Sequence, residues 1–458
     1  MPDIPREVFK AYDIRGIVGT ELTVNTVEAI GQAIGSEALA RNLTSIAIGR
    51  DGRLSGTELS QALARGIQSS GVNVIDTGMV ATPMLYYAAH ELCQYSGVMV
   101  TGSHNPPEYN GFKIVLDGET LAAESIQALR LRIENNNLNH GKGNYSEHDI
   151  TDAYLNRITD DIKFDRPMKI VVDCGNGVPG AFAPTLYRNL GCEVIELFCK
   201  VDGTFPNHHP DPSVPENLHN VIHTLATTDA EIGLAFDGDG DRLGIVTKAG
   251  HIIYADRLLM LFAADVLSRN PDGKIIFDVK CTRNLAPWIK RHGGIPLMWK
   301  TGHSFIKAKL NETNALLAGE MSGHFFFKER WYGFDDALYA GARLLELLSH
   351  HSEIGAILHD LPDSPSTPEL QIRVPEGNNH TLITQLQQNA QFDNAEQIIT
   401  TDGLRVEYHD GFGLARASNT TPVIVLRFEA DNETALKRIQ QDFQHNILRA
   451  KPDAVLPF

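Results

Sequence analysis

Residues 169–177 read KIVVDCGNG, a short apolar run that ends in an aspartate and a glycine-containing turn. Two further stretches repeat this pattern: residues 45–51 read SIAIGRD, and residues 274–282 read KIIFDVKCT. A longer amphipathic stretch follows each run, and this alternation is typical of βαβ units on a mixed or parallel sheet. Because the pattern returns at intervals of roughly 105 to 125 residues, we expect one α/β domain that is repeated three times.

Composition indicates where the domains meet. The chain has 458 residues, enough for three or four domains. Residues 135–148 (NNNLNHGKGNYSEH) form a polar spacer, and the second and third repeats meet near Tyr254. Residues 361–368 (LPDSPSTP) form a Pro- and Ser-rich connector that can be neither a helix nor a central strand, and we expect it to act as a hinge. The predicted domains are 1–148, 149–254, 255–364 and 365–458.

The last predicted domain has a different pattern. Alternating strands near Glu369 and Val423 and a closing helix from about Asn432 predict a smaller α+β domain. The fold class is therefore three similar mixed-sheet α/β domains followed by a small α+β domain.

Two helices of the first repeat can be placed from their start signals. Ser55 or Thr57 can cap a helix that runs to about Ser70. Thr82 and Pro83 place a proline at the first position of the next helix.

The overall charge excludes some partners. Asp and Glu number 57 against 40 Lys and Arg, so the formal charge is −17. Such a surface repels nucleic acids and anionic membranes, and we expect neither as a partner. The first residues, MPDIPREVFK, lack the apolar stretch of a signal peptide, and no run approaches eighteen apolar residues, so we expect a cytoplasmic protein. The 5 cysteines are odd in number and lack CxxC spacing, which favours small buried side chains over a zinc site.

The segment DGDGDR at residues 237–242 is the most specific chemical signal. It lies between the apolar runs IGLAF and LGIV, which predicts a tight loop between two buried strands. Its carboxylates at Asp237, Asp239 and Asp241 converge, and their repulsion raises their pKa values unless a cation neutralises them. An EF-hand is excluded because Arg242 and Lys248 stand where that loop needs Gly and Glu. A few carboxylates with room for a phosphate oxygen favour Mg²⁺ over Ca²⁺.

The segment TGSHNP at residues 101–106 ends another apolar run, GVMV, and predicts an exposed loop at the end of a strand. Ser103 lies between Gly and His and is a candidate nucleophile. The hydrolase elbow GxSxG is absent, because Thr101 and Asn105 occupy the places of its glycines. Taken alone, the segment is more typical of an ordinary polar turn than of a nucleophile loop.

Two further segments can bind sugars or phosphates. GEMSGH at residues 319–324 sets short polar side chains between glycines, which suits sugar hydroxyls but also a glycine-rich hairpin corner. RASNTTP at residues 416–422 combines a guanidinium with hydroxyls and small residues, which suits a phosphate but also a polar turn. Five cations stand beside predicted strand ends, each of them more typical alone of a solvated surface than of a ligand site: Arg15, Lys113, Lys280, Arg283 and His303.

Together the four segments closely resemble the motifs of the α-D-phosphohexomutase family, in particular its bacterial phosphomannomutase/phosphoglucomutase branch. One motif falls in each predicted domain, in the family's order, and the resemblance covers essentially the whole chain. It implies four domains arranged around a central cleft, with the phosphoserine, metal, sugar and phosphate loops in that order.

The resemblance also implies roles for individual residues. Ser103 would carry the transferable phosphoryl group, and Asp237, Asp239 and Asp241 would hold Mg²⁺ together with an oxygen of that phosphoserine. Arg242 would stabilise charge on the transferring group. The candidates for proton transfer are Arg15, Lys113 and His104. The residues expected to contact the substrate are Lys280, His303, Glu320, Ser322, His324, Arg416, Ser418, Asn419 and Thr420.

The implied activity is a mutase that interconverts hexose 1-phosphates and 6-phosphates of glucose and mannose. It would proceed through phospho-Ser103 and a hexose 1,6-bisphosphate, which also serves as activator. A phosphoglucosamine mutase is the alternative within the family, but that branch usually carries Gln at the position of Met321 and Ser-Gly-Thr-Glu-Pro at residues 418–422. A catalytically silent sugar-phosphate-binding protein is a second alternative, and the intact Ser103 argues against it. We expect a phosphosugar as the only partner and a monomeric chain.

Overall fold

The structure is a computed structural model that describes residues 4–375, 377–419 and 421–458. Contacts divide the chain into two compact units, which we describe separately. The first comprises Met1–Leu258 and Ser322–Asp360, and the second comprises Leu259–Met321 and Leu361–Phe458. The boundary between them falls inside helix α8 (Ala255–Arg269). This division groups residues by contact and does not test the four predicted domain boundaries.

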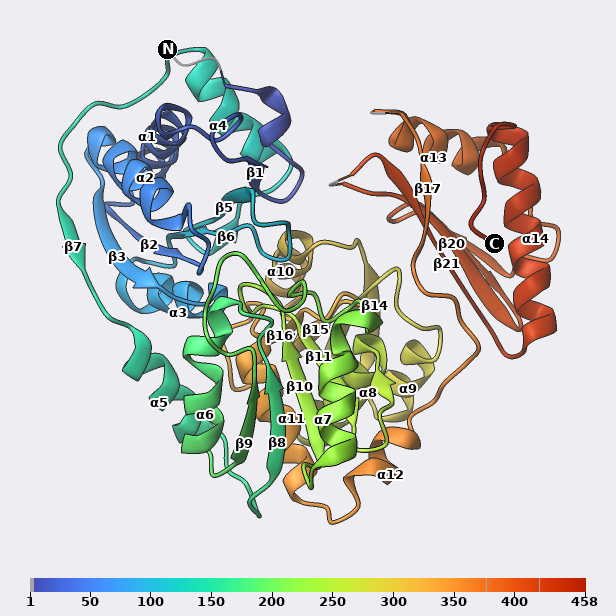
Figure 1. The fold of residues 1–458 in the computed structure, drawn as a ribbon. Helices are drawn as coiled ribbons and strands as arrows, with labels where there is room; N and C mark the ends of the chain where they lie inside the picture. Colours follow the sequence, from blue (N-terminus) through green and yellow to red (C-terminus); the bar gives the residue numbers. More distant parts are fainter. Residues whose placement is uncertain (1–3, 376, 420) are drawn as a thin grey trace. The chain divides into compact units, whose positions relative to one another are not determined.

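The first unit begins with a seven-stranded mixed sheet (Figure 1). Its strand order is β1-β5-β4-β2-β3-β7, with β6 beside β5; β4, β2, β3 and β7 run parallel and β5 runs antiparallel to both its neighbours β1 and β4. Helices α1, α2 and α4 share one apolar core with this sheet. The elements are η1 (Arg6–Val8), β1 (Ile14–Ile17), α1 (Val24–Ala40), β2 (Ser45–Arg50), α2 (Gly56–Ser70), β3 (Asn73–Met79), α3 (Thr82–Leu92), β4 (Gly97–Val100), β5 (Tyr109–Leu116), β6 (Glu119–Thr120), α4 (Glu124–Glu134) and β7 (Tyr145–Glu147).

Two details of this part of the first unit differ from the sequence prediction. Helix α2 does end at Ser70, but the side chain of Ser55 does not cap it; its hydroxyl instead accepts a hydrogen bond from Asn110 Nδ2 at 2.9 Å. The polar spacer contains the short edge strand β7, whose side chains are all exposed. An edge strand pairs through its backbone alone, so it needs no apolar pattern. Helix α3 begins at Thr82 with Pro83 in its first turn, as predicted.

The remainder of the first unit holds a five-stranded sheet in the order β12-β11-β10-β8-β9. Strands β8, β9 and β10 are parallel, and β11 is antiparallel to β10. The predicted DGDGDR loop joins β10 to β11, and all five residues of β10 are buried. The elements are α5 (Thr151–Asp161), β8 (Lys169–Asp173), η2 (Val178–Ala181), α6 (Ala183–Asn189), β9 (Glu193–Leu197), η3 (Pro215–Leu218), α7 (His219–Thr227), β10 (Ile232–Phe236), β11 (Leu243–Thr247), β12 (Ile252–Ile253), β16 (Phe325–Phe327), α11 (Ala337–Ser349) and α12 (Ile354–His359).

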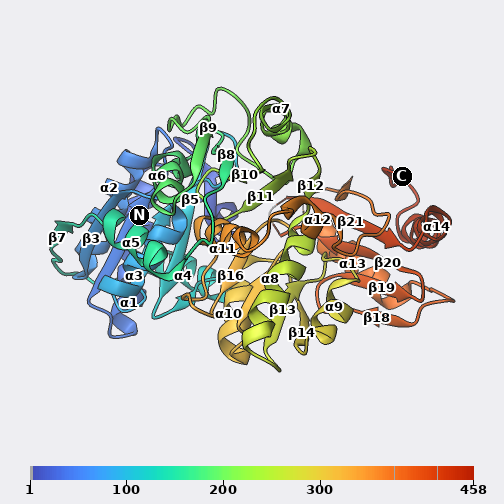
Figure 2. The same ribbon diagram turned by 90° about the horizontal axis from the view of Figure 1, so that it is seen from below.

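The second unit combines three parallel strands with an antiparallel sheet. In the first part, β13 lies between β14 and β15. In the second part, five antiparallel strands follow the order β17-β21-β20-β19-β18, and α13 and α14 share their apolar core (Figure 2). The elements are β13 (Lys274–Asp278), α9 (Leu285–Arg291), β14 (Ile295–Trp299), α10 (His303–Thr313), β15 (Leu317–Gly319), β17 (Leu370–Arg373), α13 (Asn378–Asn389), β18 (Gln397–Ile399), β19 (Leu404–Tyr408), β20 (Gly411–Ala417), β21 (Val423–Ala430) and α14 (Glu433–Ala450).

Several predictions for this unit are confirmed. Residues 361–368 form neither a helix nor a strand. Helix α14 starts directly after Asn432, whose side chain caps it by accepting a hydrogen bond from the Ala435 N–H at 3.0 Å.

The five cysteines of the chain are all buried, as predicted. In the described part of the chain, no helix is both long and apolar enough to span a membrane.

Candidate active site

Ser103 lies in the loop between β4 and β5, in an uncommon backbone conformation. Its φ is +52°, in the left-handed region that residues other than glycine seldom adopt. The loop holds it there partly because the Ser103 N–H donates to Thr101 Oγ1 at 2.7 Å. The hydroxyl is buried and donates to Asp237 Oδ2 at 3.2 Å, and His104 Nδ1 lies 3.1 Å from the same oxygen.

The three aspartates of the DGDGDR loop form one buried cluster. Asp237, Asp239 and Asp241 have no exposed surface, and their oxygens lie within 4.8 Å of one another. Gly240, with φ of +79°, lets the loop turn the carboxylates inward. Asp237 Oδ1 then accepts hydrogen bonds from the backbone N–H groups of Gly240, Asp241 and Arg242 at 3.0–3.1 Å.

The carboxylates have different partners and therefore different pKa values. Burial and the charges of Asp241 and Asp239 raise the pKa of Asp237, as predicted for converging carboxylates. Burial also acts on Asp239 and Asp241, but the ammonium of Lys113 outweighs it and lowers the pKa of both. Thr82, at the start of α3, adds a hydrogen bond to Asp239 Oδ2 at 2.5 Å.

Lys113 supplies a positive charge to this cluster from strand β5. Its Nζ donates to Asp239 Oδ2 at 2.7 Å and to Asp241 Oδ2. Burial alone would lower the pKa of Lys113, but the two carboxylates raise it, so this lysine stays protonated at neutral pH. The pairing therefore fixes a positive charge beside Asp239 and Asp241.

The donor set fits a divalent cation. Asp239 Oδ1 is buried and accepts no hydrogen bond in the described part of the chain. A buried carboxylate oxygen without a donor is costly unless a cation completes its surroundings. The Ser103 hydroxyl lies next to the same cluster, so a phosphate on Ser103 would bring further oxygens to it. Oxygen-only donors of this kind are those that Mg²⁺ prefers.

Arg15 and His104 flank the serine. Arg15, on β1, donates to Asn105 Oδ1 and to Asp13 Oδ2, both at 2.5 Å. Removal from water and the charges of Arg242 and Arg15 lower the pKa of His104 well below its ordinary value. His104 is therefore neutral at pH 7, with Nδ1 close enough to exchange a hydrogen bond with the Ser103 hydroxyl.

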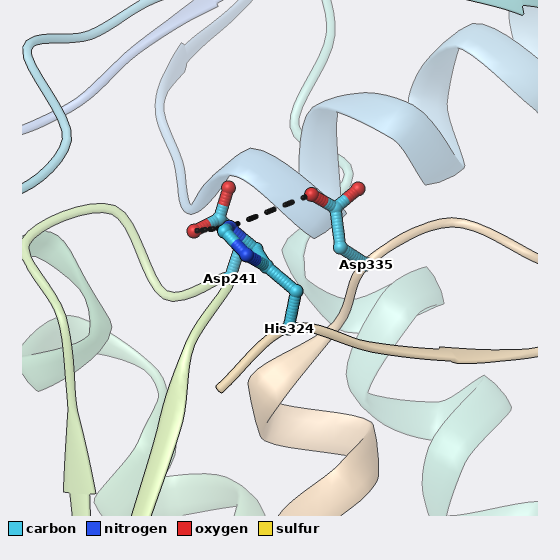
Figure 3. Close-up of side chains that lie close together, drawn as sticks. All are labelled: Asp241, His324 and Asp335. Atoms are coloured by element: carbon cyan, nitrogen blue, oxygen red, sulfur yellow. Dashed lines mark ion pairs between the residues drawn. The ribbon is translucent and has the colours of Figure 1, made fainter. Parts of the chain in front are cut away.

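His324 approaches the metal loop, which the sequence did not predict. Its Nε2 lies 3.3 Å from Asp241 Oδ1 and 4.0 Å from an oxygen of Asp335, so the ring stands between two carboxylates (Figure 3). Arg242 Nε reaches the same nitrogen at 3.4 Å, and Ser322 Oγ lies 3.1 Å from Nδ1. The backbones of Arg242 and His324 also form an antiparallel bridge. The sequence did not point to Asp335, because the acidic pair Asp335 and Asp336 directly before a helix also suits an ordinary helix start.

The second unit holds the other predicted substrate residues. Glu320 is buried, and its Oε1 accepts a hydrogen bond from the Gly302 N–H at 2.5 Å. Lys280 Nζ lies 2.5 Å from Glu369 Oε1. Burial would lower the pKa of Lys280, but Glu369 raises it. His303 is the first residue of α10 and is buried.

The predicted phosphate segment of the second unit begins with the last two residues of strand β20. Arg416 Nε donates to Asp402 Oδ2 at 3.0 Å. Ser418 Oγ shares a hydrogen bond with Thr421 Oγ1 at 3.0 Å, and Asn419 is half-buried. Thr420 lies outside the described residues. The acidic partners Glu369 and Asp402 were missed, since nothing in their local sequence distinguishes them from surface carboxylates.

Four family models match successive parts of the chain. They are the alpha/beta/alpha domains I, II and III and the C-terminal domain of phosphoglucomutase/phosphomannomutase, at residues 6–140, 152–250, 254–364 and 369–445. The chain therefore belongs to the phosphoglucomutase/phosphomannomutase family. This confirms the family predicted from the four motifs and the fold class predicted from the repeated strand pattern, and it makes the chain an intramolecular phosphotransferase.

Individual relatives match over their full length. The chain is 60% identical to the phosphoglucomutase of Neisseria meningitidis serogroup A, over 100% of both chains. It is 57% identical to the phosphomannomutase/phosphoglucomutase of Pseudomonas aeruginosa, over 100% of this chain and 99% of that protein. A crystal structure of a phosphoglucomutase/phosphomannomutase family protein from Burkholderia thailandensis is 57% identical, covers 100% of both chains and superposes with a TM-score of 0.95.

Proposed function

We propose that the chain interconverts the 1-phosphates and 6-phosphates of glucose and mannose, with Ser103 as the phosphoryl carrier. The observation that carries this proposal is the 3.2 Å contact between Ser103 Oγ and Asp237 Oδ2, which joins the candidate nucleophile to the candidate metal site. Phospho-Ser103 gives its phosphoryl group to one hydroxyl of the sugar phosphate and becomes a free hydroxyl. The resulting hexose 1,6-bisphosphate then returns its other phosphoryl group to Ser103.

Asp237, Asp239 and Asp241 would hold Mg²⁺ in this enzyme. When bound, Mg²⁺ withdraws negative charge from the transferring phosphoryl group. Lys113 donates hydrogen bonds to Asp239 and Asp241, and Arg242 is the last residue of the loop, so the chain itself places two further cations at the site. Positioned charges of this kind are the main source of catalysis in phosphoryl transfer.

We assign proton transfer at the serine to His104. Its ring is neutral at pH 7, and its Nδ1 lies 3.1 Å from Ser103 Oγ, which is hydrogen-bonding distance. Lys113 is less suited, because its pKa is raised and both carboxylates hold its proton. Arg15 is tied to Asp13 and Asn105 and serves to position the loop.

The sugar and the distal phosphate are assigned to the remaining motif residues. Glu320 would accept hydrogen bonds from sugar hydroxyls, and the hydroxyl of Ser322 would donate hydrogen bonds to them or accept them. His324 lies beside Ser322. The remaining substrate contacts are assigned to Lys280, His303, Arg416, Ser418, Asn419 and Thr420. Because one serine acts on both ends of the hexose, the bisphosphate must turn around between the two transfers, and a hinge at 361–368 would allow this. We further propose a monomeric cytoplasmic enzyme that hexose 1,6-bisphosphate activates by phosphorylating Ser103.

Peptide mapping by mass spectrometry tests the assignment of Ser103. After incubation of the native enzyme with glucose 1,6-bisphosphate and Mg²⁺, we expect the phosphate on the peptide that contains Ser103. Ser103→Ala should lose nearly all turnover in a coupled assay with glucose 1-phosphate or mannose 1-phosphate, and glucosamine 1-phosphate should be a poor substrate of the native enzyme. Ser69→Ala, which changes a serine of helix α2, is the matched control and should keep native turnover. Phosphate on another residue, or turnover by Ser103→Ala, would exclude the proposed carrier.

A further inference from the structure

Backbone hydrogen bonds satisfy only part of the loop that carries Ser103. Pro106 and Pro107 remove two N–H donors from it. Two turn bonds close it, from the Asn105 N–H to Gly102 O at 2.9 Å and from the Tyr109 N–H to Pro106 O at 3.0 Å. Several carbonyl groups of the loop therefore need donors from elsewhere in the chain.

Arg53, in the loop after strand β2, supplies these donors. Its Nη2 donates to Ser103 O at 2.9 Å and to Asn105 O at 2.5 Å. Its Nη1 donates to Pro106 O at 2.6 Å and to Tyr109 O at 2.9 Å. One guanidinium thus binds four carbonyl oxygens spread along the loop.

Asp51 fixes the guanidinium and the start of the same loop. Its Oδ2 accepts hydrogen bonds from Arg53 Nε at 3.2 Å, from Thr101 Oγ1 at 2.8 Å and from the Gly102 N–H at 3.2 Å. Its Oδ1 accepts the Arg53 N–H at 3.0 Å. Thr101 Oγ1 in turn accepts the N–H of Ser103, so the contact extends from Asp51 to the nucleophile itself.

All five N–H donors of the guanidinium are used by these partners, one by Asp51 and four by the loop. The side chain of Arg53 has no exposed surface, and that of Asp51 is 2% exposed. A guanidinium in this state has no donor left for a phosphate group. Arg53 is therefore placed to shape the loop and not to bind substrate.

The surrounding chain is built around this guanidinium. A Cβ atom at Gly102 would lie 2.4 Å from Arg53 Cζ, so only glycine lets the loop approach it. The guanidinium also lies over the ring of Phe205, whose centroid is 5.2 Å from Cζ. The close approach is a property of the loop and the arginine together.

We propose that Arg53, held by Asp51, is the positioning residue that fixes Ser103 in its left-handed conformation and keeps its hydroxyl at the metal loop. This inference rests on the proposed role of Ser103 as phosphoryl carrier. A lysine at position 53 keeps the charge, but its single ammonium cannot reach four carbonyls in a plane. A methyl group at position 102 keeps every charge and instead pushes the guanidinium away.

The test measures phosphorylation of dephosphorylated enzyme by glucose 1,6-bisphosphate in a single turnover, for Arg53→Lys and Gly102→Ala. Because a displacement of about 1 Å at a reacting group can cost about a hundredfold in rate, we expect both variants to transfer phosphate roughly a hundredfold more slowly. The half-saturating bisphosphate concentration should change little, since the substrate contacts are intact. Arg50→Lys is the matched control and should keep the native rate, because Arg50 donates to Thr57 Oγ1 instead.

The outcomes separate the two proposals. If Ser103 is phosphorylated in the native enzyme and both variants transfer at the native rate below their melting temperatures, the positioning role of Arg53 is wrong. If the native enzyme carries the phosphate on another residue, the proposed role of Ser103 is wrong whatever the variants of Arg53 and Gly102 do. A purely structural role would lower the melting temperature of the variants while leaving the transfer rate of folded protein unchanged. If Arg53→Lys does not fold, Gly102→Ala decides the question, because it retains the arginine and every charged group.

Discussion

Replacing Lys113 with methionine removes the ammonium from the metal loop while keeping a side chain of similar length. Lys113 Nζ lies 2.7 Å from Asp239 Oδ2, which at an effective dielectric constant of about 20 corresponds to an attraction of about 6 kcal/mol. Desolvation of the two groups offsets part of this attraction. Removing one partner of a buried ion pair typically costs roughly 3–5 kcal/mol, because the other charge stays buried and unpaired. We expect a loss of that size in the free energy of unfolding of Lys113→Met in the presence of a chelator.

Mg²⁺ should recover much of this loss. The carboxylates that Lys113 neutralises are the proposed ligands, so the cation replaces the missing charge. The urea midpoint of Lys113→Met should therefore rise more on adding Mg²⁺ than that of the native protein, as ligand linkage requires. Turnover of Lys113→Met should nevertheless stay low with Mg²⁺ present, because the ammonium of Lys113 is absent from the site.

Lys169→Met serves as the control for Lys113→Met. Lys169 pairs with Glu193 and Asp229 at the surface, so its loss should leave the midpoint nearly unchanged. If chelated Lys113→Met unfolds at the native midpoint, or if Mg²⁺ shifts both proteins equally, the view of Lys113 as the buried counter-charge is refuted.

Three further predictions follow from the site and its surroundings. Glu320→Ala should lower kcat/KM for glucose and mannose phosphates by similar factors of roughly 10 to 100. A hydrogen bond to a charged acceptor contributes about 1.5–3 kcal/mol, and both sugars share the hydroxyls assigned to Glu320. Factors that differ tenfold between the two sugars would contradict this. Asp239→Asn should weaken Mg²⁺ binding measured by calorimetry, and unchanged affinity would remove Asp239 from the ligand set. Burial would lower the pKa of His208, but its hydrogen bonds to Asp173 raise it. The contribution of this pair to the free energy of unfolding is therefore complete below pH ~6.5 and is lost as the pH rises through the raised pKa of His208. Unfolding free energy should fall over that range in the native protein and not in His208→Gln, and equal pH profiles would refute the pairing.

Local patterns were sufficient to predict the framework of the chain. The tight loop between β10 and β11, the start of α3 at Thr82 and the start of α14 near Asn432 each depend on a few neighbouring residues, so their signals are present in short stretches of sequence. The four motifs also predicted which loops carry chemistry. In all of these segments, a strand end or a helix start determines the position of each side chain.

The partners of the site residues could not be predicted in the same way. Arg53 is 50 residues from Ser103 in sequence, and Asp335 lies far along the chain from Asp241. A buried arginine or aspartate looks like a surface charge until the fold brings its partner to it. Lys113 shows the same effect: its place beside a strand end was predicted, but only the structure shows that it neutralises Asp239 and Asp241.

The charges of the cluster explain why the metal and the phosphoserine belong together. Three buried carboxylates face Lys113 and Arg242, which leaves one negative charge in excess. A phosphate on Ser103 would add up to two more negative charges next to Asp237, and at this burial such an excess is strongly unfavourable. One divalent cation offsets the phosphate almost fully and returns the cluster to the charge it has without either group. With the metal bound, the same count gives one positive charge without the phosphate and one negative charge with it, so the metal keeps the net charge of the site close to zero in both states.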